Sequence, residues 1–190
     1  MTNKIKYGLK NVHYAVITED EDGSITYGTP VKMPGGVSLT LDPQGEQAEF
    51  YADDAKYFSD YTNNGYSGTL EMALISDQFK KDVLGYKEDA NGVLFEDANA
   101  ATHNFALLFE FSGDKNAVRH VLYNVTASRP NQGSTTKGST IEPQTESISI
   151  TAAPASDTGL VKAKAEPSQS VYNTWYDQVY TYTEHAEPQE

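Results

Sequence analysis

The chain of 190 residues contains no cysteine and a single tryptophan. Without thiols it has no disulfide, no thiolate nucleophile and no cysteine-based zinc or iron–sulfur site. No run of 18 apolar residues occurs, so we expect no membrane-spanning segment and no membrane partner. The basic start is not followed by an apolar core, which argues against a signal peptide. These absences predict a soluble protein made in the cytoplasm.

Basic residues are also scarce. There are 14 Lys and Arg against 27 Asp and Glu, which gives a formal net charge of −13. A protein that grips nucleic-acid phosphates needs a cationic stripe, so this composition argues against specific nucleic-acid binding. The length suits one ordinary domain with a core of its own.

Aromatic residues, in contrast, are plentiful, with 13 Tyr and 7 Phe. A disordered acidic chain would contain few of them. Tyrosine packs its ring and keeps its hydroxyl hydrated, which suits half-buried strand faces and interfaces. Two interpretations are open: ordinary tyrosines on strand surfaces, or a protein that buries surface against copies of itself.

Short alternating segments bounded by turn residues dominate the chain and indicate strands. The expected strands are 5–18, 24–27, 37–41, 48–52, 68–75, 93–95, 104–111, 117–126, 147–151 and 159–165. The most apolar of them, 104–111, is the expected central core strand. The polar span 128–140 is an expected loop.

Two segments have helical spacing. A helix is expected at about 77–85, with Asp77 as its cap and Gly85 as its stop. A second helix is expected over 171–179, where apolar residues recur at i, i+1, i+4, i+5 and i+8. The predicted fold class is mainly β, an antiparallel β-sandwich or barrel with one inserted helix and a C-terminal helix.

We expect a main domain over residues 1–153 and a C-terminal extension over 154–190, packed on the same domain or on a neighbouring subunit. Within the main domain, residues 42–66 form an expected long, acidic, turn-rich interaction loop. Aromatic side chains are costly to leave in water, so this loop either folds back on its own domain or meets another subunit. The candidate interface residues are Tyr51, Asp53, Asp54, Tyr57, Phe58, Tyr61 and Tyr66.

No catalytic or metal-binding motif is present. The segment 65–69 resembles a nucleophile elbow, but Thr69 stands where that motif needs glycine. The four histidines, at positions 13, 103, 120 and 185, have no metal-ligand spacing. We therefore predict no enzyme activity, no catalytic residue, no metal and no cofactor.

Several segments together resemble one family. They are Tyr51-Ala-Asp-Asp54 with Tyr57, Gly65-Tyr-Ser-Gly-Thr-Leu-Glu71, the lead-in 1–14, the strand 37–41, and the ending from Pro154 to Tyr176. The chain is similar in these to the major tail protein, or tail tube protein, of phages with long non-contractile tails. The resemblance covers nearly the whole chain.

The resemblance implies a structural virion protein that is made in the host bacterial cytoplasm. Its subunits would form hexameric rings that stack into a tube through which DNA leaves the capsid. The implied partners are other copies of the chain, the tape-measure protein, the tail-tip initiator and the tail terminator. DNA would pass without specific binding, which the acidic composition independently favours.

Two other functions fit the composition. A carbohydrate-binding β-sandwich could stack sugars on its tyrosines, and an acidic hydrolase of the jelly-roll type could use some of its many carboxylates. A tube protein polymerises without a ligand, a sugar-binding module stays monomeric and binds glycans, and an enzyme depends on individual carboxylates.

Overall fold

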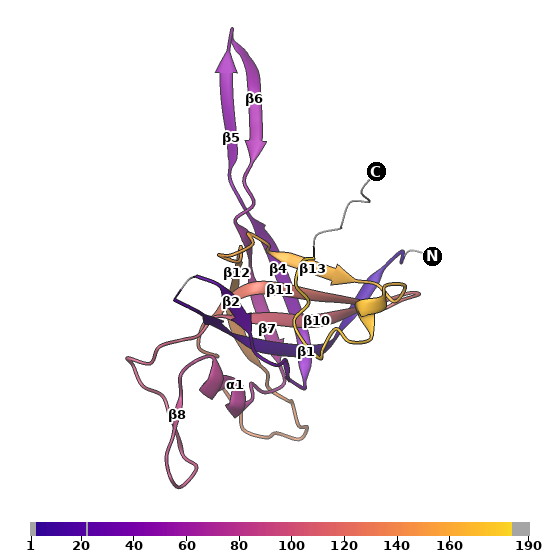
Figure 1. The fold of residues 1–190 in the computed structure, drawn as a ribbon. Coiled ribbons are helices and arrows are strands. Elements are labelled where there is room, and N and C mark those ends of the chain that lie inside the picture. Colours follow the sequence, from indigo (N-terminus) through magenta and orange to yellow (C-terminus); the bar gives the residue numbers. More distant parts are fainter. Residues whose placement is uncertain (1–2, 22, 184–190) are drawn as a thin grey trace.

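One large antiparallel sheet forms the body of the molecule (Figure 1). The computed structural model describes residues 3–21 and 23–183. The order along the sheet is β2-β1-β10-β11-β12-β7-β4, with β13 paired to β11 and β3 paired to β1. The main strands are β1 (Lys6–Glu19), β4 (Gly36–Gln44), β7 (Gly65–Met72), β10 (Phe105–Gly113), β11 (Val118–Ala127), β12 (Glu146–Ala153) and β13 (Lys162–Ala165).

The remaining strands are short or stand apart from the sheet. They are β2 (Ile25–Tyr27), β3 (Val31–Lys32), β5 (Gln47–Ala52), β6 (Ala55–Tyr61), β8 (Lys87–Glu88) and β9 (Leu94–Phe95). β5 pairs only with β6 and β8 only with β9, within the described chain. The mainly antiparallel β fold with one short helix is confirmed. The end strands β2 and β4 are not paired with each other, so the sheet is not a closed barrel.

Both faces of the central strands are covered. Alternate residues of β10 enter two separate clusters: Phe105, Leu107 and Phe109 face the first core, and Ala106 and Leu108 face the second. This explains the continuous apolar run, because a strand buried on both faces does not alternate in hydrophobicity. The expectation that 104–111 is a central core strand is confirmed.

The first core is closed by α1 (Asp77–Asp82). Ser76, not Asp77, caps this helix, because its Oγ accepts a hydrogen bond from the backbone N–H of Phe79 at 3.2 Å. Phe79 is fully buried and makes edge-to-face contacts with Tyr14 and Phe105 at 5.1 and 5.4 Å. Tyr14 also donates a hydrogen bond to Asp82 at 2.7 Å, which ties the helix to β1.

The second core is closed by the segment that follows β12. Trp175 is buried there, and its indole N–H donates to the His120 carbonyl at 3.3 Å. Arg119 forms an ion pair with buried Glu110 at 3.1 Å and lies 3.9 Å from the Tyr172 ring centroid. Together with the β13–β11 pairing, these contacts place residues 155–180 against the large sheet. The last seven residues of the expected extension lie outside the described part.

The expected helix over 171–179 is wrong. The segment contains one 3-10 turn, η1 (Ser170–Tyr172), followed by further turns. Their bonds reach back three residues, as in Trp175 N–H to Tyr172 O and Asp177 N–H to Thr174 O. All five residues of the apolar stripe still contact the second core. The spacing therefore identified the buried residues and misassigned the backbone, since aromatic and β-branched residues have only modest helix propensity.

Candidate assembly surface

The expected loop over 42–66 is a β-ribbon. β4 and β7 pair from Gly36–Met72 up to Gln44–Gly65, and β5 and β6 continue the ribbon beyond the body. Figure 1 shows the β5–β6 hairpin standing clear of the sheet, on the side away from α1. At about 3.3 Å per residue, its strands reach roughly 20 Å. The candidate residues therefore lie on a regular two-stranded arm and not in an irregular loop.

A tight turn closes the tip. Ala52 pairs with Ala55, which leaves Asp53 and Asp54 as the two-residue connection. Their φ angles are 50° and 56°. Positive φ at both central residues is the type I′ geometry that matches the twist of a hairpin. Aspartate tolerates this region better than most residues, so the two acids are part of the reason the chain reverses here.

One face of the hairpin is aromatic. Phe50 and Phe58 lie directly opposite each other. A register shift next to this pair leaves Tyr57 without a cross-strand partner, and its ring lies beside Phe50. The rings of Phe50 and Tyr57 make an edge-to-face contact at 6.5 Å. Cross-strand aromatic pairs of this kind stabilise a hairpin, but two strands alone are only marginally stable in water.

The other face carries a polar cluster. Glu49 accepts hydrogen bonds from the Lys56 ammonium and from the Tyr51 hydroxyl, the latter at 2.7 Å. The Lys56 bond, followed by the Tyr51 bond, lowers the pKa of Glu49, and the same contact with Glu49 raises the pKa of Tyr51. Gln47 donates to Ser59 at 3.0 Å. These contacts fix the strand register and leave the aromatic face free of polar partners.

The hairpin has no apolar support from the body. Every residue of β6 is exposed, including Tyr57 at 77% and Tyr61 at 70% relative exposure. Of the two alternatives left open by the sequence, folding back onto the same domain is wrong. The hairpin is therefore the candidate assembly surface, because a cluster of large aromatic side chains left in water is typical of interaction sites.

Tyr66 does not belong to this group. It lies in β7, is half-buried and packs against the first core. The Lys162 ammonium lies 4.6 Å from its ring centroid and donates to its hydroxyl at 3.2 Å. The structure thus brings six of the seven candidates together on the hairpin and places Tyr66 at its base.

Glycine fixes the junction between arm and body. Gly65 has a φ of 99°, and a Cβ at this position would overlap the Ala152 carbonyl oxygen of the neighbouring strand. The Asn64 N–H donates to Gln44 O at 2.9 Å, and the Thr62 N–H donates to Glu46 O at 3.0 Å. Backbone hydrogen bonds therefore continue from the sheet into the base of the hairpin.

No group of three or more His, Cys, Asp or Glu side chains is placed to hold a metal ion, as far as residues 3–21 and 23–183 are concerned. Within the same residues, no helix has the length and apolar character needed to cross a membrane. His185 lies outside the described residues, and His13, His103 and His120 share no site.

A protein-family model described as phage tail tube protein matches residues 1–188. The chain belongs to the phage tail tube protein family. It is therefore a structural, non-enzymatic component of the phage tail. The resemblance read from the sequence is confirmed.

A solved structure of the anti-feeding prophage cap, described as the AFP tube terminating cap, is similar to this chain. The TM-score is 0.46 and the sequences are 10% identical, over 87% of this chain and 96% of that one. No curated protein sequence matches the chain. Family membership selects the structural protein over the sugar-binding module and the hydrolase that the composition left open.

Proposed function

We propose that this tail tube protein polymerises through its β5–β6 hairpin into hexameric rings that stack as a tube. The proposed contact residues are Tyr51, Asp53, Asp54, Tyr57, Phe58 and Tyr61. The observation that carries the proposal is the solvent exposure of this aromatic hairpin, which no part of its own domain covers. Burying such side chains releases roughly 25 cal/mol for each Å² of apolar surface, and copies of the chain supply the partner surface.

The sheet offers a second contact. β4 is the end strand of the sheet, nine residues long, and six of those residues are exposed. An end strand presents unpaired N–H and C=O groups that can pair with another chain. We propose that such pairing between subunits continues the sheet around the lumen of the tube.

The charge of the chain suits a conduit for DNA. Double-stranded DNA carries about one negative charge per 1.7 Å of its axis, so a lysine-lined channel would hold it. Each subunit carries a formal charge of −13, and we propose that part of this charge faces the lumen and lets DNA slide. Purified tubes should then give no gel shift with duplex DNA at low salt. Tight binding of DNA at low salt would contradict the proposal that the lumen lets DNA pass freely.

The same charge bears on assembly. Strongly acidic subunits repel one another, and salt screens this repulsion over a Debye length of about 8 Å at physiological ionic strength. We propose that the subunit stays unpolymerised until a tail-tip initiator nucleates growth along the tape-measure protein, and that a terminator ends it. Added salt should favour growth of the tube.

Negative-stain electron microscopy over a series of protein and salt concentrations tests the proposal. Hollow tubes or stacked rings are the expected result when the tail-tip initiator is added or when high salt screens the repulsion between subunits, with longer tubes at higher salt. Their rotational symmetry gives the number of subunits per ring. Uniform monomers under every condition, also with the tail-tip initiator added, would contradict polymerisation.

A further inference from the structure

A cationic cavity of about 420 Å³ opens at the beginning of β1 and β11 and the ends of β10 and β13. Its size falls within the range of roughly 300–1,000 Å³ that is usual for binding pockets. Three lysines line it, Lys4, Lys6 and Lys164, against one lining acid, Glu166, and a second carboxylate, Asp114, lies beside it and accepts a hydrogen bond from the Lys4 backbone N–H at 2.8 Å. In a chain with about twice as many acids as bases, this is an unusual concentration of positive charge. We call it the lysine pocket.

The floor of the lysine pocket is aromatic and apolar. Phe111 and His120 lie within it with ring centroids 5.4 Å apart, and the Lys6 ammonium lies 5.5 Å from the Phe111 centroid. Ile5 adds an aliphatic side chain that is 61% exposed. The pocket therefore combines a positively charged rim with an exposed apolar interior.

His120 lies within the field of nearby lysines. Burial is the largest cause that lowers its pKa, the charges of Lys162, Lys164 and Lys6 add to it, and together they bring the pKa to about 4. Glu166 offsets part of this field, since it accepts a hydrogen bond from Lys164 at 3.3 Å. An acidic partner would be attracted to this potential, and a basic one would be repelled.

We propose that the lysine pocket receives the tip of the β5–β6 hairpin of a second copy of this chain. The inference rests on the proposed role of the hairpin in assembly, and it names the surface that the hairpin meets. The two surfaces are complementary in charge and in apolar character. Asp53 and Asp54 at the tip match the lysine rim, and the aromatic face of the hairpin matches the apolar floor.

Charge also excludes the simplest alternative. Two hairpin tips placed against each other would bring Asp53 and Asp54 next to the same acids of the partner, and like charges at close range oppose association. Contact between two different surfaces is heterologous, and it generates rings or open filaments instead of closed dimers. Such a contact suits a protein that grows as a polymer.

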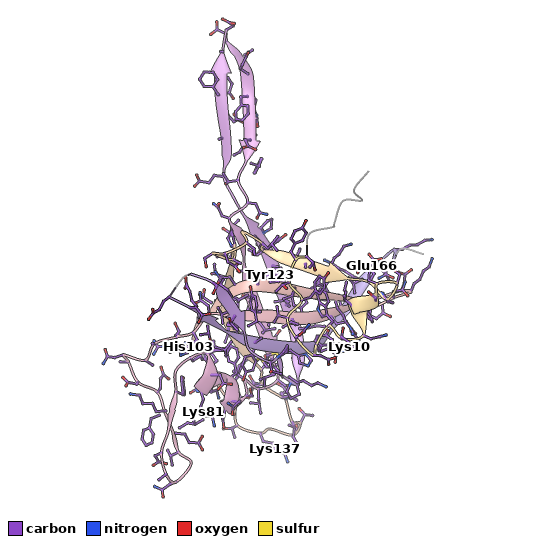
Figure 2. The ribbon with its side chains drawn as sticks, viewed as in Figure 1. Lys10, Lys81, His103, Tyr123, Lys137 and Glu166 are labelled. Atoms are coloured by element: carbon purple, nitrogen blue, oxygen red, sulfur yellow. The ribbon has the colours of Figure 1, made fainter. Side chains whose placement is uncertain are left out.

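The hairpin of a chain does not reach the lysine pocket of the same chain. No hairpin residue is among those that line the cavity. Figure 2 shows the hairpin extending away from the body, while the labelled Glu166, a lining residue, lies on the body near the N-terminal end. The acidic tip and the lysine pocket therefore both remain available to neighbouring copies.

Crosslinking tests the contact directly, because the natural chain has no cysteine. The variant Ala55→Cys with Ile5→Cys places one thiol beside the tip and one in the pocket, without removing any aromatic or charged side chain. The matched control carries Ala55→Cys with Ile141→Cys. Ile141 is also an exposed isoleucine, in the loop that carries Lys137 (Figure 2). Both variants are assembled and treated with a short bis-maleimide.

The expected result is a ladder of covalent multimers from the Ala55–Ile5 pair and none from the Ala55–Ile141 pair. Tubes that give no ladder with the first pair, or equal ladders with both, would overturn the lysine pocket as the receiving surface. They would leave the proposed function intact. If the unsubstituted chain forms no tubes at all, the proposed function itself fails, and the inference fails with it.

A double-mutant cycle gives a second measure that does not depend on thiols. Asp53→Asn with Asp54→Asn removes two charges and keeps residues that tolerate positive φ. The second double variant is Lys4→Gln with Lys6→Gln. Each of the two double variants alone should raise the critical concentration for polymerisation by roughly three- to tenfold. Combined, they should raise it little further, because either pair alone already removes the contact.

The control pair Lys80→Gln with Lys81→Gln lies on α1, outside the lysine pocket. When it is combined with the aspartate pair, the fold-increases in critical concentration should multiply, as expected for independent sites. If the fold-increase from the Lys4 and Lys6 pair also multiplies with that from the aspartate pair, the proposed contact is overturned.

Discussion

The β5–β6 hairpin and strand β10 both contain phenylalanines, but the surroundings of these side chains differ. In β10, the residues from Phe105 to Glu110 are all buried, and alternate side chains enter two cores. In the hairpin, Phe50 and Phe58 contact only each other's strand and solvent. An aromatic residue thus stabilises the fold only where neighbouring elements cover it, and elsewhere it is available for binding.

The comparison also separates two kinds of stability. The body is held by its cores, by the Tyr14–Asp82 hydrogen bond and by the Arg119–Glu110 ion pair, which lie on opposite faces of the sheet. The arm is held by its own cross-strand contacts and by its turn. Changes in the body should alter unfolding, and changes in the arm should alter assembly.

A matched pair of phenylalanines gives the largest expected contrast. Phe79→Ala removes a fully buried ring between Tyr14 and Phe105 and should lower the free energy of unfolding by about 3–5 kcal/mol. Phe58→Ala removes an exposed ring and should change it by less than about 0.5 kcal/mol. Chemical denaturation of the monomers measures both, and a large loss of stability in Phe58→Ala would show that the arm supports the fold.

The arm variants should show the reverse pattern in assembly. Tyr57→Ala and Tyr61→Ala should each leave the melting temperature of the monomer unchanged and raise the critical concentration for polymerisation. The expected increase is about tenfold, because an interfacial tyrosine contributes roughly 1–2 kcal/mol. Sedimentation of the polymer gives the critical concentration. If both variants form tubes as readily as the parent, the hairpin is not the interface.

A smaller effect concerns the pH dependence of the body. Burial, with added repulsion from nearby lysines, lowers the pKa of His120 from 6.5 to about 4. Neutral His120 is favoured in the folded state, so its contribution to stability is complete above pH 6.5 and is lost as the pH falls toward about 4.

The test compares the parent with His120→Phe, which keeps a ring stacked against Phe109 and cannot take up the proton. Between about pH 6.5 and pH 4, the free energy of unfolding should fall more steeply for the parent than for the variant. Equal slopes over this range would contradict the account of His120.

Much of the body follows from local sequence patterns. Alternation located β4, β7 and β12 to within a few residues, because only one face of each meets a core and period-2 hydrophobicity is its direct consequence. β1 and β11 were located as strands from their apolar, β-branched runs, and both of them contribute residues to both cores. Gly85 follows the short helix with a φ of 72°, as its expected role as the stop requires, whereas the cap is Ser76 and not the expected Asp77. The weak strands β3 and β8, of two residues each, carry no pattern that could reveal them.

The candidate site could be predicted only in part. Four of the six hairpin residues stood out as aromatics in an acidic segment, but β6 escaped notice because a strand exposed on both faces has no hydrophobic alternation. The two aspartates pointed to a loop, whereas their positive φ angles make a hairpin turn. The lysine pocket has no local signal, since Lys4 and Lys164 are brought together only by the pairing of β1, β10, β11 and β13.

The most direct test of the central claim is removal of the arm. Gln44 and Gly65 are paired residues at its base, so residues 45–64 can be replaced by Asn-Gly, a sequence suited to a two-residue hairpin turn. Electron microscopy and thermal melting of this variant should show a monomer as stable as the parent that forms no tubes at any salt concentration. Tubes at the parent's critical concentration would contradict the claim that the hairpin drives assembly.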